Sequence, residues 1–373
     1  MINFPKYFSI KGCGNVADKR YEYRGGCKKG LYHGLGNLSY PDGGSYSGEW
    51  RNGLRNGNGK MEFSIDNDEG RKTYIGEWRN DVIEGLGKLT WRDNNPYDVT
   101  MHVGYFVNDK EHGYGRATWQ SGHVYIGDWV NGTNTGNGKY TWPNGDSYSG
   151  DFVKGLLNGK GTKVWISGDV YTGDWVNGAL TGQGNYTWGN GDSYSGNFIN
   201  IVRTGSGIYH YENGDRYEGQ FTNNALDGKG KLVWTNGNVY TGDFVNGVRT
   251  GKGTFTFGNG KSKGDVYSGE FINDSMTGSG IYQYADGKRY EGQLINNEFN
   301  GEGRLVWTNG DVYIGDFKNS VRTGKGTYFW KNGDVYRGEF VNNTLTGKGT
   351  IVFANGDVCT ANWINDKQID SCN

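Results

Sequence analysis

The sequence repeats itself with a period of 23 residues. The stretch YSGDFVKGLLNGKGTKVWISGDV, which begins at Tyr148, is followed at Tyr171 by YTGDWVNGALTGQGNYTWGNGDS. Repeats begin at residues 23, 46, 74, 102, 125, 148, 171, 194, 217, 240, 267, 290, 313, 336 and 359, which gives fourteen complete repeats and a final half repeat. A period of this length predicts that each repeat is one supersecondary element that stacks on its neighbours.

Within each repeat, a few positions are fixed while most others vary. Counted from the first residue, position 1 is Tyr except at His102 and Cys359, position 3 is Gly except at Ala361, and positions 12 and 14 are Gly in all complete repeats. Position 5 is Trp or Phe except at Cys27 and Leu294, and position 18 is always aromatic. The fixed residues alternate with polar ones, which predicts two half-buried strands, so each repeat is expected to be a β-hairpin.

The connection between repeats decides which residues share a face of the sheet. The segments WPNGD at Trp142–Asp146 and YPDGG at Tyr40–Gly44 are typical of a three-residue loop, a type I turn closed by a left-handed Gly. Such a loop places Trp142 and Tyr148 on the same face. One face then carries the Tyr, Gly and Trp or Phe positions, and the other carries Asp, Lys, Thr and Asn. Because Gly has no side chain, a ring from a neighbouring strand can lie over it, so a single layer is enough.

These features predict an all-β protein, an elongated single-layer twisted antiparallel β-sheet solenoid of about fourteen and a half hairpin repeats. We expect residues 1–22 to form a non-repeat segment or cap, residues 23–365 the repeat array, and residues 366–373 a tail. The repeats that begin at 194, 217 and 240 match those at 267, 290 and 313 in order, which indicates that a block of three was duplicated.

The fixed residues closely resemble the MORN repeat, named for membrane occupation and recognition nexus. The pattern is Tyr-x-Gly-x-Phe-x-x-Gly from Tyr148, followed by Gly159-x-Gly161 and Trp165, and it covers nearly the whole chain. The resemblance implies an aromatic face that lines a shallow groove, and no chemistry of its own. It also implies a scaffold at membranes, cilia or the cytoskeleton, a partner-binding module beside an enzyme, or a phosphoinositide-binding protein.

Composition limits the partners and the cellular setting. The 39 basic and 40 acidic residues give a net charge of −1, so no overall field attracts nucleic acid. The cysteines Cys13, Cys27, Cys359 and Cys372 have no metal-ligand spacing, and we expect them to be reduced. The sequence has no apolar core of signal-peptide length and no run that approaches about 18 apolar residues. We therefore expect a cytoplasmic protein, free or peripheral to a membrane or the cytoskeleton, and neither secreted nor membrane-spanning.

No catalytic constellation stands out, so the chain is expected not to be an enzyme and to need no cofactor. Of the five histidines, His102 replaces the packing Tyr, and His112 and His123 are expected in loops at opposite edges, which excludes a shared metal site. The GKGT segments at Gly251–Thr254 and Gly324–Thr327 lack the following helix of a phosphate loop and are expected to be strands.

Three functional hypotheses remain. The first is a scaffold that binds protein partners through an aromatic groove formed by Trp129, Trp142, Trp165, Trp175, Trp188, Trp234, Trp307 and Trp330. The second is a peripheral membrane protein that binds acidic phospholipids through a basic loop edge formed by Arg203, Arg249, Lys252, Arg322 and Lys325. The third is a regulatory chain of a separate enzyme.

Two further features depart from the regular repeat. The longer steps place extra residues in the inter-repeat turns at 64–73, 92–101 and 261–264, and we expect the acidic first two to be solvated turns rather than calcium loops. The final half repeat, Cys359–Ile364, is expected to leave a strand edge that is either blunted by nearby charges or joined tail to tail in a homodimer.

Overall fold

The computed structural model describes residue 13 and residues 21–372 of the chain. The chain divides into two compact bodies, residues 1–189 and residues 190–373, which we describe separately. The N-terminal body contains strands β1 (Glu22–Lys28), β2 (Leu31–Ser39), β3 (Ser45–Arg51), β4 (Leu54–Glu62), β5 (Arg71–Arg79), β6 (Val82–Trp91), β7 (Val99–Val107), β8 (Lys110–Trp119), β9 (Val124–Val130), β10 (Thr133–Thr141), β11 (Ser147–Val153), β12 (Leu156–Val164), β13 (Val170–Val176) and β14 (Ala179–Thr187).

The C-terminal body contains the remaining strands and one short 3-10 helix, η1 (Gly260–Ser262). The strands are β15 (Ser193–Ile199), β16 (Val202–His210), β17 (Arg216–Thr222), β18 (Ala225–Val233), β19 (Val239–Val245), β20 (Val248–Thr256), β21 (Val266–Ile272), β22 (Ser275–Gln283), β23 (Arg289–Ile295), β24 (Glu298–Val306), β25 (Val312–Lys318), β26 (Val321–Phe329), β27 (Val335–Val341), β28 (Thr344–Val352), β29 (Val358–Ile364) and β30 (Lys367–Gln368).

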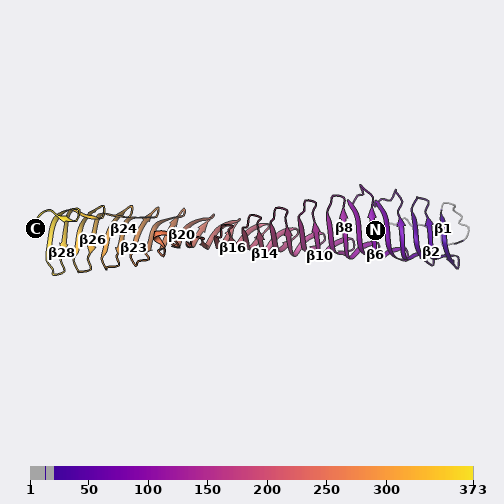
Figure 1. The fold of residues 1–373 in the computed structure, drawn as a ribbon, viewed down its shortest axis with the longest axis horizontal. Coiled ribbons are helices and arrows are strands. Elements are labelled where there is room, and N and C mark those ends of the chain that lie inside the picture. Colours follow the sequence, from indigo (N-terminus) through magenta and orange to yellow (C-terminus); the bar gives the residue numbers. More distant parts are fainter. Residues whose placement is uncertain (1–12, 14–20, 373) are drawn as a thin grey trace. The chain divides into compact units, whose positions relative to one another are not determined.

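Within each body the strands pair in chain order, each antiparallel to the one before it (Figure 1). Each repeat contributes one hairpin, such as β11 and β12, and the next repeat adds the following strand to the same sheet. The predicted fold class, an antiparallel single-layer sheet of hairpin repeats, is confirmed.

Two kinds of turn connect the strands. Inside a repeat, Lys154 and Gly155 join β11 to β12 with φ angles of 50° and 82°, the conformation of a two-residue type I′ turn. Between repeats, the Gly145 N–H donates to the Trp142 carbonyl (3.0 Å) and the Trp142 N–H donates to the Asp146 carbonyl (2.9 Å). Gly145 has φ 97°, so the predicted three-residue loop with a left-handed Gly is confirmed.

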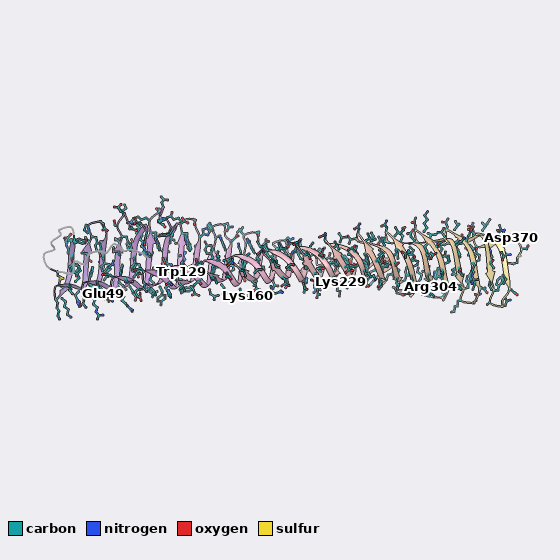
Figure 2. The ribbon with its side chains drawn as sticks, turned by 180° about the vertical axis from the view of Figure 1, so that it is seen from behind. Glu49, Trp129, Lys160, Lys229, Arg304 and Asp370 are labelled. Atoms are coloured by element: carbon teal, nitrogen blue, oxygen red, sulfur yellow. A yellow bond between two sulfur atoms is a disulfide. The ribbon has the colours of Figure 1, made fainter. Side chains whose placement is uncertain are left out.

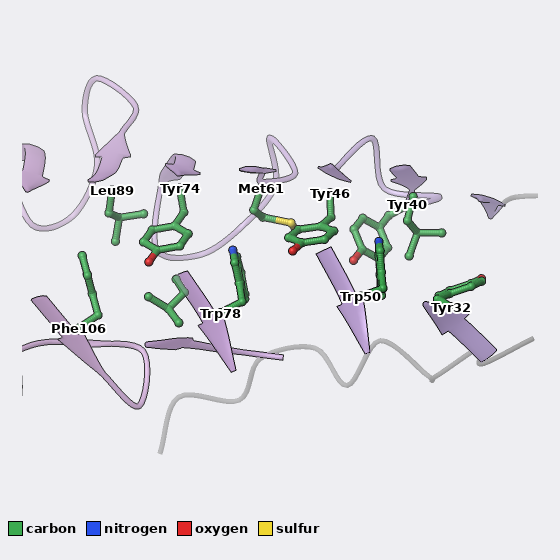
Figure 3. Packing of buried hydrophobic residues seen from close by; sticks show 11 residues of the cluster. Tyr32, Tyr40, Tyr46, Trp50, Met61, Tyr74, Trp78, Leu89 and Phe106 are labelled. Atoms are coloured by element: carbon green, nitrogen blue, oxygen red, sulfur yellow. The ribbon is translucent and has the colours of Figure 1, made fainter. Parts of the chain in front are cut away.

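The core of each body is a row of aromatic rings from positions 1 and 5. Figure 3 shows Tyr46 and Tyr74 pointing toward Trp50 and Trp78. The Tyr46 ring meets Trp50 edge to face at 5.0 Å and meets Trp78 of the following repeat at 5.5 Å. Because most tyrosines at position 1 contact rings of two repeats in this way, the row links neighbouring hairpins without a second layer.

Each Tyr at position 1 lies over two glycines of its own repeat. A Cβ atom added to Gly150 would stand 2.7 Å from the Tyr148 hydroxyl oxygen, and one added to Gly161 would stand 2.3 Å from the Tyr148 Cζ atom. These glycines hold positions 3 and 14 and face each other across β11 and β12. The expectation that glycines make room for rings is therefore confirmed. The ring comes from the same hairpin rather than from the adjacent one.

The Gly at position 12 has a different role from the one expected. Three residues around Gly159 stand opposite the single residue Asp151, because the register shifts between Gly150 and Phe152. Gly159 has φ 61°, and a Cβ there would meet the Asp151 carboxylate rather than a Tyr ring. Position 12 is Gly because the β-bulge needs a left-handed residue at a crowded point.

The cysteines correct one expectation. They are not reduced, because Cys13 is bonded to Cys27 and Cys359 is bonded to Cys372. At the C-terminus, β30 pairs with β29 through only two residue pairs, and the Asp370 carboxylate accepts a hydrogen bond from the Asn362 N–H (2.7 Å). The tail therefore folds back over part of the last strand, while the predicted segment 1–22 lies mostly outside the described residues.

Candidate functional site

The aromatic face of the sheet, formed by positions 1, 5, 10, 16 and 18, carries two rows of rings. The inner row, from positions 1 and 5, is fully packed and includes Trp129 and Trp175, which are 6% and 3% exposed. The outer row, from positions 16 and 18, has buried side chains at several position-16 sites and half-buried rings at most position-18 sites. It includes the other six tryptophans of the predicted groove: Trp142, Trp165, Trp188, Trp234, Trp307 and Trp330. The structure therefore splits the predicted set into two core residues and six residues that solvent or a partner can reach.

The outer row is held in place by the turns between repeats. The Tyr186 ring lies 5.5 Å from Trp165 and 4.6 Å from Trp188. Its hydroxyl donates to Asp169 Oδ2 (2.9 Å), and burial and this carboxylate raise the pKa of Tyr186. The same bond from position 16 to the preceding turn recurs at Tyr209, Tyr282 and Tyr328. The partly exposed rings are thus fixed before any partner arrives, which lowers the entropic cost of binding.

The predicted arginines lie on the aromatic face rather than on a loop edge. The Arg249 guanidinium lies 5.5 Å from the Trp234 ring and 5.4 Å from the Phe255 ring. It donates to Asp274 Oδ1 (2.8 Å) and to the Asp274 carbonyl (2.9 Å). Arg203 and Arg322 make the corresponding contacts with the carbonyls of Asn224 and Asn343.

The predicted lysines lie on the opposite, polar face, which is formed by positions 2, 4, 13 and 15. Lys252 and Lys325 are exposed there, and their backbone N–H groups each donate to a position-4 carboxylate, Asp243 and Asp316, at 3.1 Å. The five residues of the predicted basic edge therefore do not form one row. Lipid binding stays a prediction without a continuous cationic surface to support it.

The acidic side chains of the polar face have a structural role. Position 4 accepts a hydrogen bond across the bulge in repeat after repeat, as Asp174 does from the Gln183 N–H (2.9 Å). Lys160 pairs with Asp174 and Lys229 with Asp243, and the bond from Lys160 holds the pKa of Asp174 below its usual value. Figure 2 labels the two lysines, Lys160 and Lys229. In the C-terminal body this face forms a trough of about 1140 Å³ lined by Lys252, Glu270 and similar residues of both signs.

A smaller cavity of about 470 Å³ lies on the aromatic face of the N-terminal body. It is lined by His102, by three tryptophans and by residues of the first two long turns, among them Arg71 and Tyr97. The expectation that these turns are simply solvated is wrong for Arg71, which is 7% exposed and pairs with Glu69. Sequence reasoning noticed the substitution at His102 but not the cavity.

The histidines and the GKGT segments lie at separate places in the sheet. Within residues 21–372 and at residue 13, no group of three metal-ligating side chains comes together. His112 lies inside strand β8 rather than in a loop, and His123 Nδ1 lies 3.0 Å from the Tyr140 hydroxyl. Both GKGT segments lie in strands, β20 and β26, as predicted. Among the described residues, no helix is long and apolar enough to cross a membrane.

Comparison of the sequence with models of known protein families identifies the repeat. The model of the MORN repeat matches residues 23–45, 46–67, 74–95, 102–124, 125–147, 148–170, 171–193, 194–216, 217–239, 240–262, 267–289, 290–312, 313–335 and 336–358. The chain therefore belongs to the MORN-repeat proteins, with fourteen matched repeats. A search of curated proteins finds no match to the sequence.

Solved structures resemble the chain only in a general way. The TCP10 domain of Danio rerio CPAP is 13% identical, covering 61% of this chain and 98% of that domain, with a TM-score of 0.31. The TCP domain of Drosophila melanogaster SAS-4, solved with a proline-rich motif of Ana2, is 15% identical, covering 42% and 83%, with a TM-score of 0.28. A streptogramin B lyase is 12% identical, covering 69% and 85%, with a TM-score of 0.12. At these scores the likenesses carry no argument about function.

Proposed function

We propose that this chain is a non-catalytic MORN-repeat scaffold that binds protein partners along the outer row of its aromatic face. The observation that supports this proposal is the half-burial of six tryptophans at one repeated position, beside arginines on the same face. Tryptophan, tyrosine and arginine are the residues most enriched at binding hot spots. The guanidinium groups are already held by hydrogen bonds, as are Tyr186 and Tyr328, whose rings contact four of these tryptophans, so this face resembles a formed docking surface.

The test compares two variants of the full chain in capture of partners from the cells in which it naturally occurs. In the first, Trp142, Trp165 and Trp188 are changed to Ala; in the second, Lys160, Lys229 and Lys252 on the polar face are changed to Ala. We expect the tryptophan variant to lose the captured partner and the lysine variant to retain it. Equal capture by both variants would contradict the proposal, provided that thermal melting shows both to be folded.

The other hypotheses predict different results in the same experiment. A regulatory chain would capture an enzyme, whose activity can then be measured with and without the chain. Binding of acidic phospholipids would appear as salt-sensitive flotation with anionic liposomes, and it would be weakened by changing Arg249, Lys252, Arg322 and Lys325 to Glu. The tail-to-tail homodimer is a separate hypothesis, because it concerns the C-terminal strand edge and not the aromatic face.

A further inference from the structure

Two arginines of the aromatic face differ in how their charge is balanced. Arg249 and Arg322 hold the same place, position 10, in the two copies of the duplicated block. Each donates through Nη2 to the backbone carbonyl of the residue at position 8 of the next repeat, which is Asp274 (2.9 Å) in one copy and Asn343 (2.7 Å) in the other. The Asp274 side chain also gives Arg249 a carboxylate partner at 2.8 Å, whereas Asn343 gives Arg322 only a neutral amide oxygen at 3.4 Å. Arg322 therefore lacks the counter-ion that its equivalent has.

The surroundings of Arg322 do not supply this charge from elsewhere. Its guanidinium lies 5.3 Å from the ring centres of both Trp307 and Tyr328, and burial lowers the pKa of Arg322. In the described part of the chain no carboxylate forms an ion pair with it: Asp311 is bonded to the Tyr328 hydroxyl (2.9 Å) and Asp366 to a backbone N–H (2.7 Å). Its Nη1 atom has no hydrogen-bond partner within residues 21–372 and is not closed off from solvent. A half-buried cation of this kind favours an anion supplied from outside.

Two tryptophans of the outer row flank this charge. Trp307 and Trp330 hold position 18 of consecutive repeats, and the Tyr328 ring lies between them, 5.4 Å from the first and 4.8 Å from the second. The four side chains of Trp307, Arg322, Tyr328 and Trp330, which we name the Arg322 patch, are all half-buried, so each presents part of its surface to a partner. Hydrogen bonds hold Tyr328 and Arg322 in place, so the patch is formed before a partner binds.

The spacing of the tryptophans indicates the conformation of a segment that can follow the row. Equivalent rings recur about every 9.6 Å, because each repeat adds two strands that are about 4.8 Å apart. The distances through Tyr328 agree, since together they allow at most about 10 Å between Trp307 and Trp330. A polyproline II helix presents the same side every three residues, about every 9.3 Å. An extended strand does so about every 6.7 Å and an α-helical heptad about every 10.5 Å, so polyproline II stays closest in step with the rings.

We propose that the Arg322 patch binds a proline-rich segment of a partner protein in the polyproline II conformation. Two prolines, three residues apart, lie on Trp307 and Trp330, and an acidic residue between them pairs with Arg322. This inference rests on the proposed scaffold function and names the chemistry of the segment that a partner presents. Proline suits the patch because a preformed polyproline II helix loses little entropy when it docks on aromatic rings. The missing counter-ion of Arg322 selects an acidic segment over a basic one.

The experiment titrates the full chain with a capped nonapeptide, one glutamate between two runs of four prolines, followed by ligand-observed NMR. Analogues carry glutamine or lysine in place of the glutamate. We expect the glutamate peptide to bind about ten-fold more tightly than the glutamine peptide, the factor typical of a hydrogen bond to a charged group, and the lysine peptide to bind most weakly. A flexible peptide with the same glutamate between glycines and serines should bind much more weakly than the proline peptide, because it is not preformed.

Variants separate the charge from the rings. Asn343→Asp gives Arg322 the carboxylate that Asp274 gives Arg249, at a residue with a similar φ angle, 70° against 66°. The preference for glutamate over glutamine should then disappear while weak binding of both peptides persists. Trp330→Ala should weaken both peptides equally, because it removes one of the two rings. Arg249→Gln, the matched change in the other copy of the block, should leave the preference unchanged.

Four results would overturn the proposal. They are absence of binding by the glutamate peptide, equal binding by the glutamine peptide, retention of the preference in Asn343→Asp, and equal binding by the flexible peptide. If none of the peptides binds but the tryptophan variant described above still loses its captured partner, this inference fails and the scaffold function stands.

Discussion

Adding one methyl group beneath a buried tyrosine should destabilise a single hairpin. In Gly253→Ala, the new Cβ would stand 2.4 Å from Cε2 and 2.6 Å from Cζ of the Tyr240 ring, so the ring has to move. Displacement weakens two edge-to-face contacts, with Phe244 at 5.2 Å and Phe271 at 5.0 Å, each contributing about 0.5–1.5 kcal/mol. It also weakens the hydrogen bond from the Tyr240 hydroxyl to the Asp243 carbonyl (3.0 Å), which contributes about 0.5–1.5 kcal/mol.

The expected loss is about 2–3 kcal/mol, after allowing about 0.5–1 kcal/mol for the lower chain entropy of Ala in the unfolded state. The control is Gly247→Asn in the same hairpin, because a Cβ there meets nothing within 4 Å and Asn224 occupies the same position with φ 69°. Hydrogen exchange read by mass spectrometry should show loss of protection in β19 and β20 for the first variant only. If Gly253→Ala exchanges no faster than Gly247→Asn, the ring-over-glycine account of the fold is refuted.

Three further predictions concern separate parts of the chain. Because the folded pKa of His102 is about 4, below its unfolded value of about 6.5, only the unfolded state takes up this proton between those pH values. Stability should therefore fall as the pH is lowered from 6.5 to 4, by up to about 3 kcal/mol, and chemical denaturation of His102→Tyr should lack this part of the slope. Reduction of the Cys359–Cys372 disulfide, or Cys372→Ser, should raise hydrogen exchange in β29 and β30 and leave the preceding hairpins unchanged, since repeat stability is local. Light scattering should give twice the chain mass if the C-terminal edge joins two chains, and Asp370→Ala, which frees the Asn362 N–H, should favour that dimer; a monomer in both cases would reject it.

The regular part of this fold could be predicted because the same short sequence patterns recur in every repeat. The alternation of fixed and polar residues predicted the strands. The Pro-Asn-Gly within Trp142–Asp146 predicted the inter-repeat turn, which the structure confirms. The Gly positions 3 and 14 were correctly assigned to the ring side. Each of these predictions depends on residues that are close in sequence and that recur in every repeat.

The position of the arginines could not be predicted from alternation alone, although one signal was present. Asn246-Gly247 forms a two-residue turn, with φ angles of 49° and 84°, which makes position 5 pair with position 10 and brings Arg249 against Phe244. Recognising this turn would have placed Arg249 on the aromatic face. The cavity at His102 was harder to foresee, because it depends on how two turns without a repeating register fold over one face.

The side-chain register on either side of the three-residue bulge at position 12 limits where this chain can gain residues. An extra residue within either strand would shift the rings off their glycines and carry charged side chains to the core face. The connection between hairpins is less constrained, and the three extensions in this chain lie there, at 64–73, 92–101 and 261–264, the first two also lengthening the starts of β5 and β7. Heritable variation in this protein is therefore expected to take two forms: gain or loss of whole 23-residue copies by unequal recombination, and growth of these connections into new binding elements.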